Sequence, residues 1–178
     1  MTSDPEFELL VSTAEDLKGS YIREGISDPW FGSPFLWIRT LPSRRVGKVG
    51  EQLVSTWCLT KGFDVRRSGD SDADRVIAGR RMEIKFSTLW ESGVYTFQQI
   101  RDQNYEYVFC LGISPFAAHA WVIPKPIIQQ HAGFQQGGQR GNDTRWLSFP
   151  ATDPPPWLAD YGGTLAQALE VLTRISQA

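Results

Sequence analysis

The chain has only two cysteines and two histidines among its 178 residues. Cys58 and Cys110 stand in apolar segments without a Cys-x-x-Cys pair, and His119 and His131 are far from both in the sequence. A structural zinc site needs about four such ligands, so this composition excludes one. We expect both thiols to be buried and reduced, His119 to pack within a strand, and His131 to lie in a loop.

Long hydrophobic runs are also missing. No stretch of about 18 apolar residues occurs, which excludes a membrane-spanning helix. Residues 1–8 are acidic and lack the basic start and apolar stretch of a secretory signal. The 12% of aromatic residues and the moderate 21% of charged residues argue against disorder. We therefore expect a cytoplasmic protein with one compact domain, or one domain with extensions, and no membrane partner.

Excess charge of one sign is absent from the chain as a whole, which has a formal net charge of -2. Residues 1–28, however, are strongly acidic, and the remaining residues carry a small positive excess. The basic side chains gather in two segments, and such clusters can attract phosphate or simply form a solvated surface. They are Arg39, Arg44, Arg45 and Lys48, then Arg66, Arg67, Arg75, Arg80, Arg81 and Lys85.

Hydrophobic periodicity and turn residues predict the order of the elements. Residues 1–42 are interrupted by Pro and Gly and are expected to be irregular. The predicted elements after them are a helix over 43–62 with Ser43 as its N-cap, a strand over 63–67, a hairpin over 74–86, a helix over 97–103 capped by Thr96, strands over 105–113 and 117–123, a Gln/Gly-rich loop over 129–145, and a terminal helix capped by Thr164.

Three charged residues of the predicted hairpin are Asp74, Glu83 and Lys85. Residues two apart on a strand share a face, so Glu83 and Lys85 point the same way. A two-residue turn at 78–79 places Asp74 opposite Glu83, about 5 Å away between Cβ atoms. A turn at 79–80 places Asp74 opposite Lys85 instead. All three side chains share one face in either case.

Two carboxylates without histidine or cysteine are hard oxygen ligands, of the kind that hold Mg²⁺. Asp74 and Glu83 are the predicted metal ligands, for Mg²⁺ or for Mn²⁺ in its place. Lys85 beside the metal is expected to position and help ionise a water molecule, and the cations together to stabilise a pentavalent phosphate. The simpler alternative is a cross-strand salt bridge worth under about 1 kcal/mol.

The motif and the order of the predicted elements over residues 43–123 resemble the PD-(D/E)xK nuclease superfamily. The segment Gly47-Lys48-Val49-Gly50-Glu51 is also similar to a first-helix motif of that superfamily, in which a glutamate assists metal binding. The resemblance adds Glu51 to the expected catalytic residues Asp74, Glu83 and Lys85. Ala73 stands where the motif has proline, and Asp72 is the reserve candidate for the first carboxylate.

The fold implied by this resemblance is α/β, with a central mixed β-sheet flanked by helices. Its divisions are an N-terminal extension over 1–42, a nuclease core over 43–123, and a C-terminal recognition or dimerisation extension over 124–178. The implied function is a Mg²⁺-dependent endonuclease of double-stranded DNA, similar to a type II restriction enzyme and acting as a homodimer. The alternatives are a structure-specific nuclease of the Holliday-junction resolvase type and a non-catalytic DNA-binding module.

Basic, amide and hydroxyl side chains outside the motif are expected to contact DNA. Gln, Asn and Arg read purine edges in the major groove, and Phe97-Gln98-Gln99-Ile100-Arg101 resembles a stretch seen in such nucleases. The predicted contact residues are Arg44, Arg45, Lys48, Ser87, Gln98, Gln99, Gln139, Arg140, Asn142 and Arg145.

Overall fold

The structure, a computed structural model, describes residues 11, 13, 28–134 and 144–177. The predicted DNA contacts Gln139, Arg140 and Asn142 lie outside these residues. The chain divides into two compact units, residues 1–31 and 32–178. In the first, the Asp28 carboxylate accepts a hydrogen bond from the Trp30 amide at 3.0 Å, which forms a tight turn. The second unit contains the elements described below.

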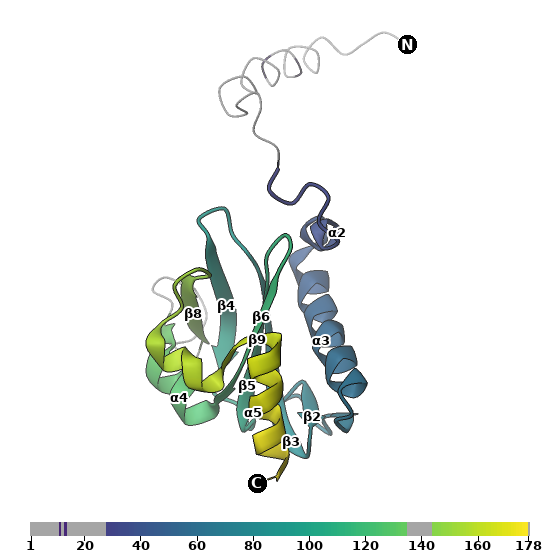
Figure 1. The fold of residues 1–178 in the computed structure, drawn as a ribbon, viewed down its shortest axis with the longest axis vertical. Coiled ribbons are helices and arrows are strands. Elements are labelled where there is room, and N and C mark those ends of the chain that lie inside the picture. The colour runs from purple at the N-terminus through teal and green to yellow at the C-terminus, as the bar shows by residue number, and fades with distance from the viewer. Residues whose placement is uncertain (1–10, 12, 14–27, 135–143, 178) are drawn as a thin grey trace. The chain divides into compact units, whose positions relative to one another are not determined.

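A mixed six-stranded sheet flanked by helices forms the centre of the second unit, which confirms the predicted fold class (Figure 1). Neighbouring strands are antiparallel except for the parallel pair β3 and β5. In spatial order the strands are β1 (Val65–Arg67), β2 (Arg75–Ile77), β3 (Arg80–Thr88), β5 (Tyr107–Ile113), β6 (Ala118–Pro124) and β9 (Gly162–Thr164).

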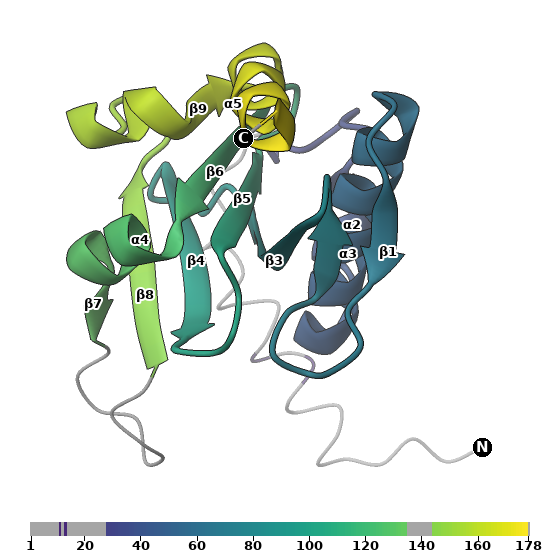
Figure 2. The ribbon, with the colours of Figure 1, turned by 90° about the horizontal axis from the view of Figure 1, so that it is seen from below.

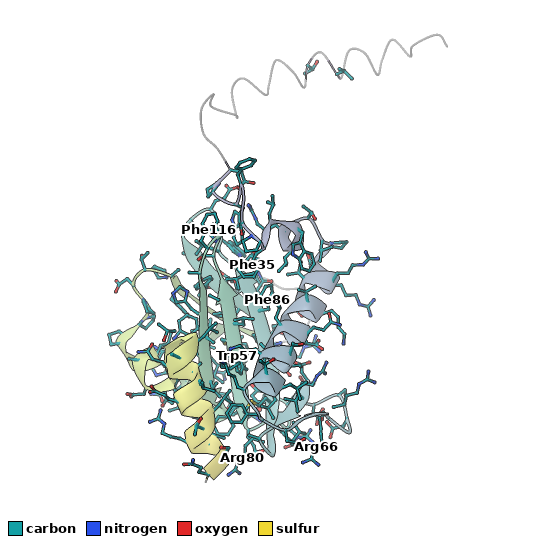
Figure 3. The ribbon with its side chains drawn as sticks, turned by 45° about the vertical axis from the view of Figure 1, so that its right-hand side comes forward. Phe35, Trp57, Arg66, Arg80, Phe86 and Phe116 are labelled. Carbon is teal, nitrogen blue, oxygen red and sulfur yellow. The ribbon has the colours of Figure 1, made fainter. Side chains whose placement is uncertain are left out.

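Strand β5 is apolar along nearly its whole length because both of its faces are covered. On one face, the ring of Phe109 contacts that of Trp57, with centroids 6.0 Å apart. Trp57 belongs to the helix of residues Ser43–Thr60 and lines one cavity with Phe109 and with Leu165 of the last helix (Figure 3). On the other face, Val108 and Cys110 belong to the main hydrophobic core. Such a strand must lie inside the sheet, as its sequence predicts.

Helix α3 (Ser43–Thr60) packs on β3 and buries Gly50, Val54 and Cys58, which recur every four residues. Gly62, with φ at +86°, follows its end as predicted. The predicted N-cap is wrong by one position, because Pro42 is the N-cap and Ser43 is the first helical residue. The fixed φ of Pro42 is compatible with that place, and no side chain caps the helix.

Helix α5 (Leu165–Gln177) begins where Thr164 predicts it. The Thr164 hydroxyl accepts a hydrogen bond from the Gln167 amide at 3.2 Å, and the Gln167 side chain accepts one from the Thr164 amide at 2.8 Å. This reciprocal pair is a capping box. Ala168, Val171 and Leu172 form its buried side.

In the described part of the second unit, three short helices complete the structure: α2 (Leu36–Arg39), α4 (Lys125–His131) and a 3₁₀ helix (Pro156–Tyr161). The loop predicted over 129–145 is wrong at both ends, because α4 occupies its start and strands occupy 133–134 and 144–145. Its middle, residues 135–143, lies outside the described residues. His131 ends a helix instead of lying in a loop. Its ring stacks on Trp157 at 4.1 Å between centroids, which holds it in place.

A second, three-stranded sheet has the order β4 (Val94–Arg101), β8 (Thr144–Pro150) and β7 (Gly133–Phe134). The predicted helix over 97–103 is wrong, because β4 occupies most of that segment. Tyr95 and Phe97 alternate along this strand and bury their rings against the larger sheet. Their period of two is that of a strand, but the decisive pairing comes from β8, some fifty residues later. The order helix, three strands, helix, strand that the resemblance implies is therefore not found.

The main core lies between the two sheets. Viewed from below, α5 lies on one side of β5 and β6, and β4 and β8 lie on the other (Figure 2). Tyr95, Phe97, Trp121 and Phe149 meet in this core, the last two edge to face at 5.1 Å. The Tyr95 hydroxyl lies 3.0 Å from Nδ1 of His119, and burial lowers the pKa of His119. The expected packed strand histidine is confirmed.

Both cysteines are buried and free, as the sequence predicts. Burial raises the pKa of the Cys58 thiol to about 12 and also raises that of Cys110. Neither thiol is therefore a nucleophile at neutral pH.

Candidate functional site

The hairpin of β2 and β3 places Asp74 beside Glu83. The strands pair Ile77 with Arg80, Val76 with Arg81 and Arg75 with Met82. Ala78 and Gly79 form the turn, with φ of +52° and +78°, the combination of a type I′ turn. The first of the two predicted registers is therefore the one found.

Asp74 lies just before β2 and is tied to β3 by its backbone and its side chain. Its amide donates to the Met82 carbonyl at 3.0 Å, and its Oδ2 accepts a hydrogen bond from the Ile84 amide at 2.7 Å. The carboxylate is thus fixed against the strand that carries Glu83 and Lys85. The reserve candidate Asp72 instead forms a loop contact, in which its amide donates to Asp70 at 3.0 Å.

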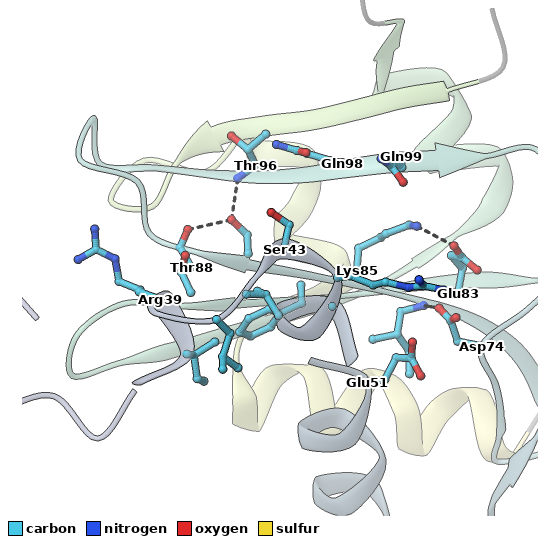
Figure 4. Close-up of a pocket in the computed structure, with 18 of the residues that line it drawn as sticks. Arg39, Ser43, Glu51, Asp74, Glu83, Lys85, Thr88, Thr96, Gln98 and Gln99 are labelled. Carbon is cyan, nitrogen blue, oxygen red and sulfur yellow. Dashed lines mark hydrogen bonds and ion pairs between the residues drawn. The ribbon is translucent and has the colours of Figure 1, made fainter. Parts of the chain in front are cut away.

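Glu83 and Lys85 point to the same side of β3 and form an ion pair, with Oε1 and Nζ 2.7 Å apart (Figure 4). Their side chains are 9% and 15% exposed. A nearly buried pair of this kind is worth little as a stabilising device, since desolvation offsets its attraction.

Helix α3 brings Glu51 to the same place. A Cβ built on the preceding Gly50 would lie 2.3 Å from the Phe86 Cβ, so only glycine permits this approach of α3 to β3. Glu51 Oε2 lies 3.3 Å from Arg75 and 3.2 Å from Lys48. Glu51 is therefore a partly buried, positioned carboxylate and not a freely solvated one.

A cleft of about 730 Å³ runs between α3 with its preceding segment, β3, and β4. Glu51, Asp74, Glu83 and Lys85 lie toward one end, and Arg39 and Thr88 lie at the other (Figure 4). Two stretches of the sequence, residues 38–51 and 74–99, thus contribute to one hollow. The remaining lining residues are Ile38, Leu41, Ser43, Arg44, Val46, Gly47, Ile84, Phe86, Ser87, Trp90, Thr96, Gln98 and Gln99.

The electrostatics of the carboxylates reflect burial and mutual repulsion. Burial raises the pKa of Glu83, Lys85 opposes this rise, and the charge of Asp74 adds to it. Burial also raises the pKa of Asp74, the hydrogen bond from the Ile84 amide opposes it, and the charge of Glu51 adds to it. Both carboxylates therefore occupy a setting in which a further cation would favour their charged forms.

The donor set fits Mg²⁺. Asp74 and Glu83 offer hard oxygen atoms, and Glu51 lines the same cleft. Within residues 28–134 and 144–177, no group of three or more acidic, histidine or cysteine side chains lies close enough to enclose a metal. Two protein carboxylates match the habit of Mg²⁺, which keeps several waters and completes its shell with substrate phosphate.

Gln98 and Gln99 both line the cleft because β4 is bulged between them. Phe97 pairs with Leu147 and Ile100 with Arg145, so β4 has one extra residue at this point. Gln99 takes a positive φ of +57°. In a regular strand, neighbouring side chains would face opposite ways. The bulge turns two consecutive amides toward the same hollow.

The other predicted contact residues are divided. Arg44 and Ser87 line the cleft. The Ser87 hydroxyl is used internally, since it donates to the Thr88 carbonyl and accepts from the Thr96 amide, each at 3.0 Å. Arg45 and Lys48 are exposed on α3 outside the lining, and Arg145 donates to the Gln129 carbonyl. None of these last three lines the cleft, although Lys48 contacts it through its ion pair with Glu51.

Sequence reasoning missed two contributors. Arg75 pairs with Glu51, and the sequence showed it only as one member of a basic cluster. Trp90 lines the cleft from the turn between β3 and β4 with 48% of its surface exposed. An aromatic residue in a turn was the available signal, but only the fold places it beside Arg39.

The described residues include no helix of the length and hydrophobicity that crossing a bilayer requires. Comparison with family models gives no match, and neither does comparison with curated proteins. Among solved structures, the chain is similar to one described as a bacterial homing endonuclease, I-Ssp6803I. The match covers 77% of this chain and 97% of that one, with a TM-score of 0.49 and 16% sequence identity. A likeness at this level identifies neither a family nor an activity.

Proposed function

We propose that this protein is a Mg²⁺-dependent endonuclease that hydrolyses phosphodiester bonds of double-stranded DNA, as type II restriction enzymes do. The observation that carries the proposal is the convergence of Asp74, Glu83 and Lys85 in one cleft, with Glu51 beside them. Carboxylates and an ammonium gathered in a partly desolvated hollow suit a metal ion and a phosphate better than they suit stability.

Asp74 and Glu83 are the residues that would hold the metal, with Glu51 in support. The chemistry that a bound Mg²⁺ supplies in such a site is neutralisation of phosphate charge and acidification of a water molecule. The Ile84 amide fixes one Asp74 oxygen at 2.7 Å, which limits the carboxylate to a narrow range of orientations. Such fixed donors are effective because they need little rearrangement during the reaction.

Lys85 is the group that would act on the reacting atoms. Its ammonium is held 2.7 Å from Glu83 and so remains near the carboxylates. There it can orient the attacking water by a hydrogen bond and stabilise the negative charge that grows on the phosphate oxygens. These interactions strengthen in the transition state, so they raise the rate more than the affinity.

Either strand of a DNA duplex would enter from the open side of the cleft. Arg44 and Arg39 on its lining can pair with phosphates. Gln98 and Gln99 offer amide donors and acceptors, which suit base edges or phosphate oxygens. Cutting both strands at one palindromic site would most simply use a two-fold dimer.

The test is a cleavage assay with purified protein, with and without Mg²⁺. The substrates are linear duplex DNA of mixed sequence and a synthetic four-way junction, and sequencing the fragment ends locates the cuts. We expect discrete fragments from the duplex only when Mg²⁺ or Mn²⁺ is present. Cuts confined to the junction would replace this proposal with a junction-resolving activity. No cut in either substrate, across varied genomic DNA, would refute the nuclease proposal.

A further inference from the structure

The cleft continues into a second hollow at the end away from the carboxylates. This hollow has a volume of about 560 Å³ and is lined by Arg39, Thr88, Leu89, Trp90, Glu91 and Ser92. Arg39, Thr88 and Trp90 line both spaces. A DNA strand that lies along the cleft therefore meets these three side chains on the side of the cleft away from Asp74 and Glu83.

The turn that carries Trp90 is held by four backbone hydrogen bonds. The Trp90 amide donates to Val94 at 3.0 Å, and its carbonyl accepts from Gly93 at 2.9 Å. On either side, the Leu89 amide donates to Ile113 at 2.8 Å and the Gly93 carbonyl accepts from Ala151 at 3.0 Å. The indole is thus presented from a fixed backbone, although 48% of its surface is exposed.

The chemistry of this hollow suits a nucleobase. An exposed indole on a fixed turn is a stacking platform, since every base has a π-face and stacking depends little on sequence. Glu91 also lines the hollow, and its carboxylate disfavours a phosphate there. Arg39 stands where the hollow meets the cleft and offers a guanidinium to the neighbouring phosphate.

We propose that Trp90 and Arg39 form a nucleobase subsite, in which Trp90 stacks on one base that is out of the duplex stack and Arg39 binds the phosphate next to it. This inference rests on the proposed function and deepens it, because it means that bound duplex DNA is locally opened, with one base out of the stack. Trp90 is five residues beyond Lys85 along β3 and the turn, which is roughly 15 Å of extended chain. The stacked base therefore lies a few nucleotides from the cut.

The experiment measures binding of fluorescein-labelled 20-nucleotide DNA, single-stranded and duplex, by anisotropy in EDTA, where metal-dependent cutting does not occur. Trp90→Ala should weaken binding of single-stranded DNA by about 5- to 160-fold, the range that one base–aromatic stack contributes. Trp90→Phe should retain most of the affinity. Trp37→Ala is the matched control, since Trp37 is 52% exposed but lines neither hollow, and it should bind like the wild type.

A scan of single abasic sites along the duplex then locates the stacked base. Removing the base at one position should weaken binding of the wild type and leave binding of Trp90→Ala unchanged. Equal affinity of Trp90→Ala and the wild type for single-stranded DNA would overturn the subsite. So would a scan in which every abasic site weakens the binding of Trp90→Ala as much as it weakens that of the wild type. If the wild type cuts duplex DNA while the subsite fails, the proposed function stands alone. If the wild type binds no DNA of either form and cuts none in the presence of Mg²⁺, both fall.

Discussion

The close packing of α3 on β3 predicts opposite effects for two glycine substitutions three residues apart. A Cβ at Gly50 would lie 2.3 Å from the Phe86 Cβ and 2.5 Å from its Cγ, far inside van der Waals contact. The Phe86 Cβ is attached to the backbone and cannot turn away, so the helix or the strand must move. A Cβ at Gly47, in the same helix, would meet nothing within 4 Å.

The magnitudes follow from two competing effects. Replacing a mid-helix glycine with alanine gains about 1 kcal/mol of helix propensity. Forcing extra volume into a packed contact costs about 1–3 kcal/mol, and a contact this short belongs at the upper end. Gly50→Ala should therefore lose about 2 kcal/mol, and Gly47→Ala should gain about 1 kcal/mol. For a chain of this size, these correspond to a Tm lower by about 4–8 °C and higher by about 2–4 °C, respectively.

Thermal and urea unfolding followed by circular dichroism measure both changes. Because Glu51 follows Gly50, the Gly50→Ala shift should also displace this carboxylate and reduce cleavage activity. A similar change of Tm in the same direction for the two variants would refute the argument, since propensity alone would then decide both.

Four further outcomes follow from the site and its surroundings. Lys85→Ala should reduce cleavage at least 100-fold while changing duplex affinity little; equal losses in both, measured by single-turnover kinetics and anisotropy, would contradict its role. Glu51→Gln should give a milder loss of rate, and wild-type rate and Mg²⁺ dependence in this variant would leave Glu51 without a functional part. Ala78→Asn should stabilise the protein by about 1 kcal/mol in urea unfolding, because asparagine tolerates positive φ better than alanine; an unchanged or lower midpoint would refute the strain. Burial lowers the pKa of His119 in the folded state below 6.5, the ordinary value of a histidine side chain. The contribution of His119 to stability is therefore complete above pH 6.5, and it decreases as the pH falls from 6.5 toward the lowered pKa. His119→Gln should therefore show a smaller loss of urea midpoint between pH 7.5 and 5.5 than the wild type, and parallel pH profiles would contradict this.

Much of the α/β architecture could be predicted because local signals agreed with tertiary packing. The helical spacing of Val49, Leu53 and Trp57, and of the pair Val54 and Cys58, predicted α3. The capping box of Thr164 with Gln167 started α5 by hydrogen bonds within four residues. The turn residues left two registers open, and both place Asp74 on the face of Glu83 and Lys85. The structure has the turn at Ala78-Gly79, which brings Asp74 beside Glu83.

Residues 97–103 show where local signals were insufficient. The segment carries apolar residues that suit either a helix or a bulged strand, and pairing with β8 decides for the strand. The sequence also could not show that Gln98 and Gln99 face the same hollow, because the bulge depends on the register against a strand some fifty residues away. Non-local pairing of this kind leaves no periodic trace in the segment itself.

By itself, the sequence determined which chemistry the protein can offer: the residue types and spacing of Asp74, Glu83 and Lys85 put two acids and an amine on one face of a hairpin. Tertiary structure alone decided what lies opposite them. Glu51 reaches the carboxylates because Gly50 lets a helix approach a strand closely, and Trp90 reaches Arg39 because a turn and a short helix lie at the same end of the cleft. A face is set by the two-residue period of one strand, whereas a cleft needs segments that are distant in the chain to pack together.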